Sequence, residues 1–193
     1  FLSAVIYVHN AERNVEEFLG TMITCMERNF EHSEIICVND SSDDGSLEKI
    51  RKVAANASNT SISVVNMSYF HGCEASMNAG IDMAIGDFVF EFDNMLLDFD
   101  ENIVMGIYRH SLEGFDVVSA SPDRKEKFTS RVFYNVFDKF TDSPYKMSTE
   151  SFRILSRRAI NLIRNINKTV PYRKAVYANC GLKTDNVRYE VKY

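Results

Sequence analysis

The sequence lacks the features that mark several broad classes of protein. No apolar run approaches the roughly 18 residues that a membrane-spanning helix needs. No signal peptide is visible, and Phe1 opens directly on a strand-like run, so we expect the true N-terminus to be missing. The four cysteines, Cys25, Cys37, Cys73 and Cys180, form no CxxC pair. We interpret them as buried, reduced thiols of a cytosolic protein.

The motifs of common phosphate sites and hydrolases are also missing. There is no GxxxxGK[ST] and no GxGxxG motif, so a glycine loop that cradles phosphate is not indicated. Neither HExxH nor a Ser/His/Asp order occurs. His9, His71 and His110 are scattered along the chain, which favours structural over catalytic roles for them.

The net charge of −5 argues against nucleic acid as the main partner. Residues 1–120 hold 20 Asp and Glu against 6 Lys and Arg, whereas residues 121–193 hold 7 against 16. This asymmetry suggests two faces with different partners. The basic part is either a solvated surface or a contact for an anionic membrane surface, and the composition leaves both open.

Apolar patterns predict strands and helices in alternation over the first hundred residues. The expected strands cover 2–8, 35–38, 61–65 and 88–92, and the expected helices cover 15–26, 47–55 and 74–84. Strands separated by helices of about ten residues indicate a parallel sheet with right-handed crossovers. The predicted fold class is therefore α/β, with a mostly parallel central sheet flanked by helices.

The remainder of the chain continues the same domain. It is expected to form helices over 101–112, 132–140 and 157–166, and strands over 115–120, 152–155 and 184–193. No repeat, linker or low-complexity segment divides the 193 residues, so we predict a single domain. The shift in composition near residue 120 marks two subregions, 1–120 and 121–193.

The stretch from Gly86 to Asp100 contains the boundary between a predicted buried strand and an acidic loop. An apolar, aromatic run, Phe88 to Phe92, is typical of a buried strand and stops at Asp93, with Asp98 and Asp100 behind it. Carboxylates at the mouth of an apolar strand need a cation, a donor or water. Because ligands of open α/β sheets bind at the carboxyl ends of the strands, we predict that Asp93 lies on the floor of a ligand site.

Three loops should share that edge of the sheet: 9–12, 39–46 and 93–100. Glu12, Asp40 and Asp93 are predicted to converge there. Carboxylates accept hydrogen bonds from the base and ribose of a nucleotide, and they also bind a hard divalent cation that neutralises a diphosphate.

These loops resemble the motifs of the family 2 glycosyltransferases, which have the Rossmann-like GT-A fold. Residues 5–12, VIYVHNAE, resemble a first strand that ends in P-x-Y-N-x-E, and residues 34–46, EIICVNDSSDDGS, resemble EIIIVDDGSTDGS. Residues 78–89 are similar to N-x-G followed by A-x-G-D-Y-I, and Asp93 falls at the DxD motif.

A narrower branch is also similar, that of the polyprenyl-phosphate glycosyltransferases, which include the dolichol-phosphate mannose synthases. Residues 70–76, FHGCEAS, resemble its NFGKEAA segment. Residues 130–134 and 151–159 resemble its SRxFY and DFRLLSRRA segments, and residues 172–189 resemble its last stretch before the membrane helices.

The resemblance implies roles for individual residues. Glu12 and Asp40 would bind the base and ribose, Asp93 would face the ribose and diphosphate, and Arg131 and Arg153 would contact the acceptor's phosphate. With Asp93, these arginines form the implied catalytic set. The implied nucleotide-binding set is Tyr7, His9, Asn10, Glu12, Asp40, Ser42, Glu74, Asn78 and Asp93.

The implied activity is inverting transfer of a sugar from a UDP- or GDP-sugar to a polyprenyl phosphate at the cytoplasmic face of a bacterial cell membrane. A phosphate is already a nucleophile at neutral pH, so it needs positioning and charge neutralisation more than a general base. Two alternatives remain. One is elongation of a cell-surface polysaccharide, where a hydroxyl acceptor needs a carboxylate base. The other is a degenerate, noncatalytic nucleotide-sugar-binding domain.

Departures from the family pattern concern the cofactor most. Met95 stands where the second Asp of DxD would bind Mg²⁺ or Mn²⁺, and a thioether is a poor ligand for either. Three consequences are open: Asp98 supplies the missing oxygen beside Asp93, the activity depends less on a metal ion, or the activity is lost. Tyr7 replaces the first-strand proline, Asn39 replaces the first Asp of DDGS, and Arg124 is the candidate for the absent GxR arginine.

Overall fold

The computed structural model describes residues 1–123, 150–166, 173, 176–177 and 181–192. Contacts within the chain divide it into two compact units, Phe1–Leu97 and Asp98–Tyr193. Each unit contains strands with helices packed against them, as an α/β fold requires.

The first unit alternates strands and helices without exception. Its elements are β1 (Leu2–Val8), α1 (Val15–Asn29), β2 (Ser33–Asn39), α2 (Ser46–Ala54), β3 (Thr60–Asn66), α3 (Cys73–Met83) and β4 (Phe88–Phe92). The strands lie in the order β3-β2-β1-β4, and every neighbouring pair is parallel. The predicted parallel arrangement is confirmed, and the carboxyl ends of all four strands meet at one edge.

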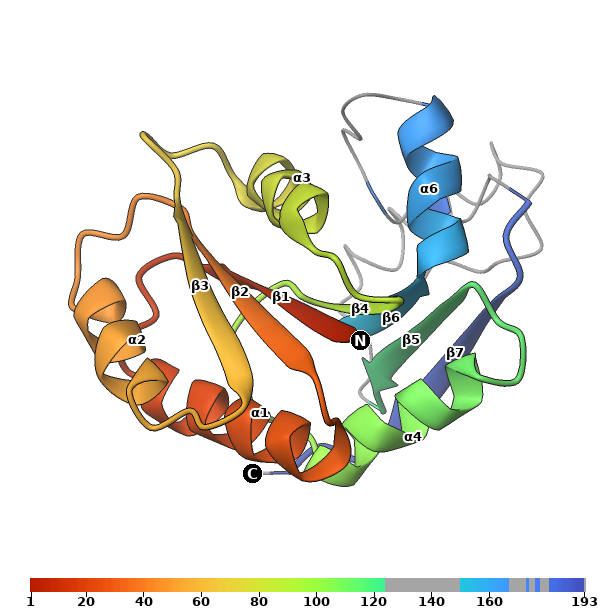
Figure 1. Ribbon diagram of the computed structural model, residues 1–193, viewed down its shortest axis with the longest axis horizontal. Helices are drawn as coiled ribbons and strands as arrows, with labels where there is room; N and C mark the ends of the chain where they lie inside the picture. The colour runs from red at the N-terminus through yellow and green to blue at the C-terminus, as the bar shows by residue number, and fades with distance from the viewer. Residues whose placement is uncertain (124–149, 167–172, 174–175, 178–180, 193) are drawn as a thin grey trace. The chain divides into compact units, whose positions relative to one another are not determined.

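Helix α3 covers one face of these strands, and α1 covers the other (Figure 1). A Cβ placed on Gly80 of α3 would lie 2.4 Å from Val5 Cγ1 and 2.6 Å from Val38 Cγ2, so only glycine permits this close packing. On the opposite face, the rings of Phe18 in α1 and Phe92 in β4 meet edge-on, with centroids 5.3 Å apart.

The pleat of the strands then decides which side chains reach the α3 face. Side chains alternate along a strand, so residues two positions apart share a face. Tyr7 therefore lies on the face of Val5. Asp40 follows β2 and lies on the same side, because its carboxylate accepts a hydrogen bond from Tyr7. This places two of the predicted site residues beside α3, at the edge where β1 and β2 end.

Strand β4 departs from the prediction in one residue. The run from Phe88 to Phe92 was expected to be apolar, but it contains Glu91, which is fully buried. Glu91 pairs in register with Val5 of β1, so it also points to the α3 face. The description of this strand body as apolar was wrong at Glu91, which stands in the sequence itself; the structure adds that the fold encloses its carboxylate completely.

The second unit is built around β5. Its elements are α4 (Glu101–Ser111), β5 (Val117–Pro122), β6 (Phe152–Ser156), α6 (Arg157–Ile166) and β7 (Thr184–Tyr189). Strand β5 is antiparallel to β6 and parallel to β7. Each corresponds to a predicted element, whereas the helix predicted over 132–140 lies outside the described residues.

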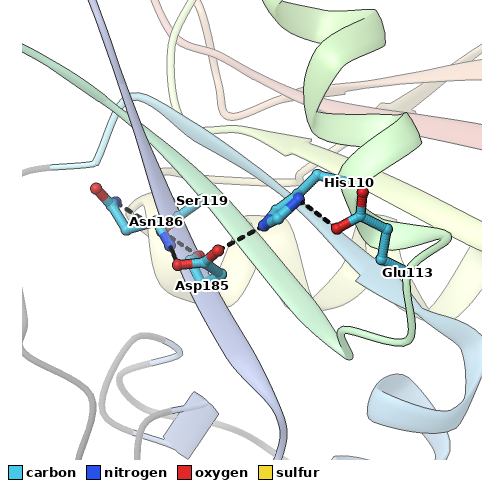
Figure 2. A network of polar contacts seen from close by, with 5 residues as sticks. All are labelled: His110, Glu113, Ser119, Asp185 and Asn186. Carbon is cyan, nitrogen blue, oxygen red and sulfur yellow. Dashed lines mark hydrogen bonds and ion pairs between the residues drawn. The ribbon is translucent and has the colours of Figure 1, made fainter.

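Two polar clusters hold this unit together. Asp116 accepts hydrogen bonds from Arg158 Nη1 (2.6 Å), Ser156 Oγ (3.1 Å) and the Lys183 backbone (3.1 Å). Figure 2 shows the second cluster, in which His110 of α4 lies between two carboxylates: Glu113 one turn along and Asp185 on β7. Beyond Asp185, Asn186 Nδ2 donates to Ser119 Oγ at 2.9 Å.

The interpretation of the cysteines as buried, reduced thiols holds for two of those described. Cys25 and Cys37 are buried, and burial raises the pKa of the Cys37 thiol to about 12. Cys73 is only half-buried at the start of α3, so the expected burial was wrong at this position. Cys180 lies outside the described residues.

Candidate functional site

The loops that follow β1 and β2 are joined to each other by hydrogen bonds along their length. The Asn10 backbone donates to Ser42 Oγ at 3.1 Å, and Asn10 Oδ1 in turn accepts from the Asp43 backbone at 2.8 Å. One residue further, the Ala11 backbone donates to Ser46 Oγ at 2.9 Å. The two predicted loops therefore form one continuous rim.

Glu12 takes part in this junction through its side chain. Its Oε2 accepts a hydrogen bond from the Gly45 backbone at 2.8 Å. A Cβ on Gly45 would lie 2.8 Å from the same oxygen, so the contact depends on glycine. Lys49 Nζ also donates to the Glu12 carbonyl at 2.9 Å. In the structure, the predicted base- or ribose-binding carboxylate connects the two loops.

Asp44 strengthens the junction, although the sequence did not single it out. Its Oδ2 accepts from the Glu12 backbone at 3.1 Å, and its Oδ1 accepts from Ser46 Oγ at 2.5 Å and the Ser46 backbone at 3.0 Å. Burial alone would raise the pKa of Asp44, but these hydrogen bonds hold it below its ordinary value. A signal existed: Asp two residues before a Ser at a helix start is typical of a local turn.

Asp40 extends this rim to a third loop, the one that follows β3. Its fully buried carboxylate accepts hydrogen bonds from Tyr7 Oη (2.7 Å), the His71 backbone (2.8 Å) and the Gly72 backbone (2.9 Å). Burial by itself would raise the pKa of Asp40, but these donors hold it below its ordinary value. Burial and the neighbouring carboxylate raise the pKa of Tyr7, so its hydroxyl stays protonated and donates.

Aromatic side chains surround this junction. His9 Nδ1 lies 2.7 Å from the Asp40 carbonyl, and its ring contacts that of Phe70 at a centroid distance of 4.9 Å. The Tyr69 and His71 rings are stacked, with centroids 4.0 Å apart. The sequence had marked only His9 of these residues as part of the site.

The backbone of the rim adopts unusual conformations. Asn10 has a φ of 47° and Ser41 a φ of 55°, and they are the positive-φ residues other than glycine that the described chain contains. Gly72 follows with a φ of 84°. Each of the three loops therefore contains a left-handed residue at the same edge of the sheet. Such conformations are costly at residues other than glycine and cluster at functional sites.

Asp93 lies at the end of β4 and next to the start of α3. It is half-buried, and Cys73 Sγ is 3.9 Å from its Oδ1 and 4.0 Å from its carbonyl. Glu74 and Asn78 are one turn apart on α3 and are both partly exposed. The structure therefore brings α3 and Asp93 together, with Cys73 as the contact that the sequence did not predict.

The predicted cation ligands Asp93 and Asp98 belong to different units, and their joint role stays a prediction. Among the described side chains, no group of three or more His, Cys, Asp or Glu is placed to hold a metal ion. Met95 is buried, with 3% of its surface exposed. Asp98 belongs to the second unit, where it is buried and accepts from Tyr189 Oη at 3.1 Å. Asp93 remains the one predicted metal ligand at the rim whose carboxylate suits Mg²⁺ or Mn²⁺.

The predicted phosphate-binding arginines are only partly described. Arg153 on β6 is fully buried, and its Nε donates to Glu150 Oε2 at 2.9 Å. The Glu150 side chain is itself almost fully buried, so both charges are desolvated and their contact offsets part of that cost. Arg131 lies outside the described residues, and the acceptor-binding role stays a prediction for both arginines. Arg124, the candidate for the GxR arginine, also lies outside the described residues.

A parallel α/β sheet with acid, amide and aromatic side chains at its carboxyl edge is typical of the open α/β proteins that bind ligands at that edge. Comparison with known proteins defines the class further. Residues 3–180 match the model of glycosyl transferase family 2, and the chain belongs to that family. The predicted family and GT-A fold are confirmed.

Relatives and solved structures agree with this assignment. An uncharacterized glycosyltransferase of Synechocystis sp. is 30% identical over 98% of this chain and 60% of its own length. A bactoprenol glucosyl transferase of Shigella phage SfV is 26% identical over 97% of this chain and 62% of its own. The structure of a mannosyltransferase from Pyrobaculum calidifontis, in complex with GDP-Man and Mn²⁺, is similar with a TM-score of 0.71 at 16% identity, over 98% of this chain and 55% of that one.

The chain spans about three-fifths of the length of these two relatives. None of the helices that the structure describes combines the length and the hydropathy of a membrane span.

Proposed function

We propose that this domain binds a nucleotide-sugar at the edge formed by β1, β2 and β4, and transfers the sugar with inversion to a polyprenyl phosphate. One observation carries the proposal: the loops after β1, β2 and β3 are fastened to one another, so acid, amide and aromatic groups from distant segments form a single rim. Because the loops are already ordered, ligand binding does not incur the conformational-entropy cost of ordering them.

The donor would lie across this rim. Asn10, Ser42 and Glu12 face the base or ribose in the proposal, and Glu74 and Asn78 line the α3 side. Asp93 faces the ribose and the diphosphate. A divalent cation, Mg²⁺ or Mn²⁺, would neutralise diphosphate charge when bound, and Asp93 is the described residue that would hold it. The Pyrobaculum mannosyltransferase, which contains GDP-Man and Mn²⁺, supports the donor class.

In the proposed reaction an oxygen of the acceptor phosphate attacks the anomeric carbon from the side opposite the diphosphate. The new bond to the phosphate oxygen forms as the bond to the diphosphate oxygen breaks, and the nucleoside diphosphate leaves with the electron pair. The acceptor is already ionised, so no side chain has to remove a proton. Arg131 and Arg153 stay in the proposal as the contacts of the acceptor phosphate.

The acceptor and its place rest on the relatives. The similarity to a bactoprenol glucosyl transferase supports a polyprenyl phosphate as the acceptor. Because a polyprenyl chain resides in a membrane, we propose that the reaction takes place at a membrane surface, on its cytoplasmic face. The excess of Lys and Arg after residue 120 fits contact with an anionic membrane surface.

Calorimetry tests the donor site. The domain is titrated with UDP, GDP and their sugars, with and without Mn²⁺. We expect one of the two nucleotides to bind, and Asp93→Asn to weaken binding most in the presence of Mn²⁺. Glu17→Gln, an exposed change on α1, is the matched control and should bind as the natural chain does. Failure of every nucleotide to bind would contradict the proposal.

A second candidate is favoured by Met95. Its buried thioether removes one carboxylate from the expected cation site, so the domain would bind nucleotide-sugars without transferring the sugar. Transfer of a radiolabelled sugar to polyprenyl phosphate in vesicles separates the two: labelled lipid supports the transferase, and binding without labelled lipid supports the noncatalytic domain. Label on a saccharide hydroxyl would instead indicate chain elongation.

A further inference from the structure

The short loop from Tyr69 to Gly72 is held more firmly than its exposure suggests. The backbone N–H groups of His71 and Gly72 both donate to the buried Asp40 carboxylate, at 2.8 Å and 2.9 Å. His71 Nδ1 contacts the Tyr69 carbonyl, and Gly72 has a φ of 84°, which favours glycine there. The conformation of the loop is thus fixed through its backbone and not by burial of its side chains.

The same loop exposes two large aromatic side chains. Tyr69 is 66% exposed and Phe70 is 58% exposed. Among the described residues, the ring neighbour of each is an imidazole: the Tyr69 ring stacks on His71 at 4.0 Å and 21°, and the Phe70 ring meets His9 at 4.9 Å and 59°. Exposed aromatic faces on a fixed backbone lose little side-chain freedom on binding and are typical of stacking surfaces.

The surrounding charge shows what such a surface suits. Residues 53–108 contain no Lys and no Arg, so the loop, α3 and β4 all belong to a stretch without a cationic side chain. A phosphate or an anionic lipid headgroup would meet no counter-charge from this stretch. A planar, uncharged ring is the chemistry that fits, and Asp40 and His9 place the loop at the carboxyl edge of β1 and β2.

We propose that Tyr69 and Phe70 form the stacking surface for the base of the donor nucleotide, and that Tyr7 positions this surface through Asp40. The inference rests on the proposed function and adds to it the residues that hold the base. Stacking is tolerant of base identity because every base has an aromatic face. Choice between pyrimidine and purine would then depend on polar groups at the edge of the base.

The test measures dissociation constants of UDP and GDP by calorimetry, with pyrophosphate as a probe that lacks the base, all in Mn²⁺. Stacking of one base contributes about 1–3 kcal/mol, so Phe70→Ala and Tyr69→Ala should each weaken nucleotide binding roughly 5- to 150-fold. Pyrophosphate affinity should not change. Phe70→Tyr keeps an aromatic face and should restore nucleotide affinity to within about twofold.

The matched control is Ile85→Ala. Ile85 is 69% exposed in the same unit, but it precedes β4 and so lies at the opposite edge of the sheet from the rim. It should change neither affinity. Tyr7→Phe should weaken nucleotide binding more than pyrophosphate binding, a difference that general loss of stability does not produce.

Each other outcome overturns the inference in a recognisable way. Unchanged nucleotide affinity in both alanine variants would contradict stacking on Tyr69 and Phe70, but it would not contradict the proposed donor site. Equal loss for nucleotide and pyrophosphate means that the loop matters only for the fold of the rim. Loss of binding to anionic phospholipid vesicles, with nucleotide affinity intact, means that Tyr69 and Phe70 contact a membrane. Absence of nucleotide binding by the natural chain overturns the proposed function as well.

Discussion

The hydroxyl of Tyr7 donates a 2.7 Å hydrogen bond to Oδ2 of Asp40, and this contact joins the end of β1 to the residue that follows β2. The family pattern has proline at the position of Tyr7, and proline has no group that could make this bond. Because the same carboxylate also holds the His71–Gly72 backbone, Tyr7 acts on a loop more than 60 residues away in the sequence.

Removal of that hydroxyl should weaken the first unit. Tyr7→Phe leaves the buried Asp40 carboxylate with two backbone donors, and a hydrogen bond to a charged group contributes about 1.5–3 kcal/mol. We expect the free energy of unfolding in urea to fall by roughly 1.5 kcal/mol. Tyr69→Phe removes a hydroxyl from an exposed ring and should change it by less than about 0.5 kcal/mol. Equal stability of the two variants would contradict the role given to Tyr7.

Gly45→Ala tests the junction between the first two loops. Its Cβ would lie 2.8 Å from Glu12 Oε2, so the Glu12 side chain must move and lose its bond to the backbone at residue 45. We expect a loss of about 1–2 kcal/mol in the free energy of unfolding and weaker nucleotide binding by calorimetry.

Gly20→Ala is the matched control for that substitution. Gly20 lies inside α1, and a Cβ there would meet nothing within 4 Å. Alanine should therefore stabilise the helix by about 0.5–1 kcal/mol and leave nucleotide affinity unchanged. A stable Gly45→Ala variant with normal affinity would show that the Glu12 contact is dispensable.

The pH dependence of stability should reveal the His110–Asp185 contact. His110 Nε2 lies 2.5 Å from Asp185 Oδ2 (Figure 2). Burial would raise the pKa of Asp185, but hydrogen bonds from His110 and the Asn186 backbone hold it below its ordinary value of about 3.9. A carboxyl whose folded-state pKa is lowered contributes stability above its unfolded pKa, and the contribution is lost as the pH falls through the folded pKa.

Asp185→Asn should therefore destabilise the second unit at pH 6–7, and the deficit should shrink toward pH 2–3. The effect will be modest because Asp185 is 45% exposed and water screens the charge. Glu113→Gln is the control: Glu113 also contacts His110, but it is 66% exposed and should matter less. Urea unfolding across this range measures both, and a deficit that is constant with pH would contradict the assignment.

The elements could be predicted from the sequence because local patterns specify them. The hydrophobic runs of β1 and, apart from Glu91, of β4 stop at polar residues, and the predicted bounds 2–8 and 88–92 match the observed strands. The partners of the rim acids could not be predicted in the same way. Glu12 and Asp40 bind backbone groups that lie 31–33 residues away, and these contacts depend on turns that only the folded loops define.

Met95→Asp would restore the DxD pattern, yet the structure predicts a cost. Met95 is 3% exposed, so a carboxylate at this position would be desolvated and its pKa raised. We expect the variant to lose at least about 2 kcal/mol of unfolding free energy at pH 7 and to recover part of it near pH 5, because a raised folded-state pKa makes stability fall as the pH rises. Met95→Leu conserves volume and should cost less than about 1.5 kcal/mol.

Addition of Mn²⁺ to Met95→Asp distinguishes a carboxylate that is only buried from one that binds the metal ion. If the carboxylate of Met95→Asp reached the cation beside Asp93, saturating Mn²⁺ would stabilise the variant selectively, by an amount that grows with the ratio of metal concentration to dissociation constant. We expect no such selective gain, since burial turns the side chain away from solvent in the structure. Selective stabilisation by Mn²⁺, together with faster sugar transfer, would show that position 95 faces the metal and that methionine there weakens an otherwise complete site.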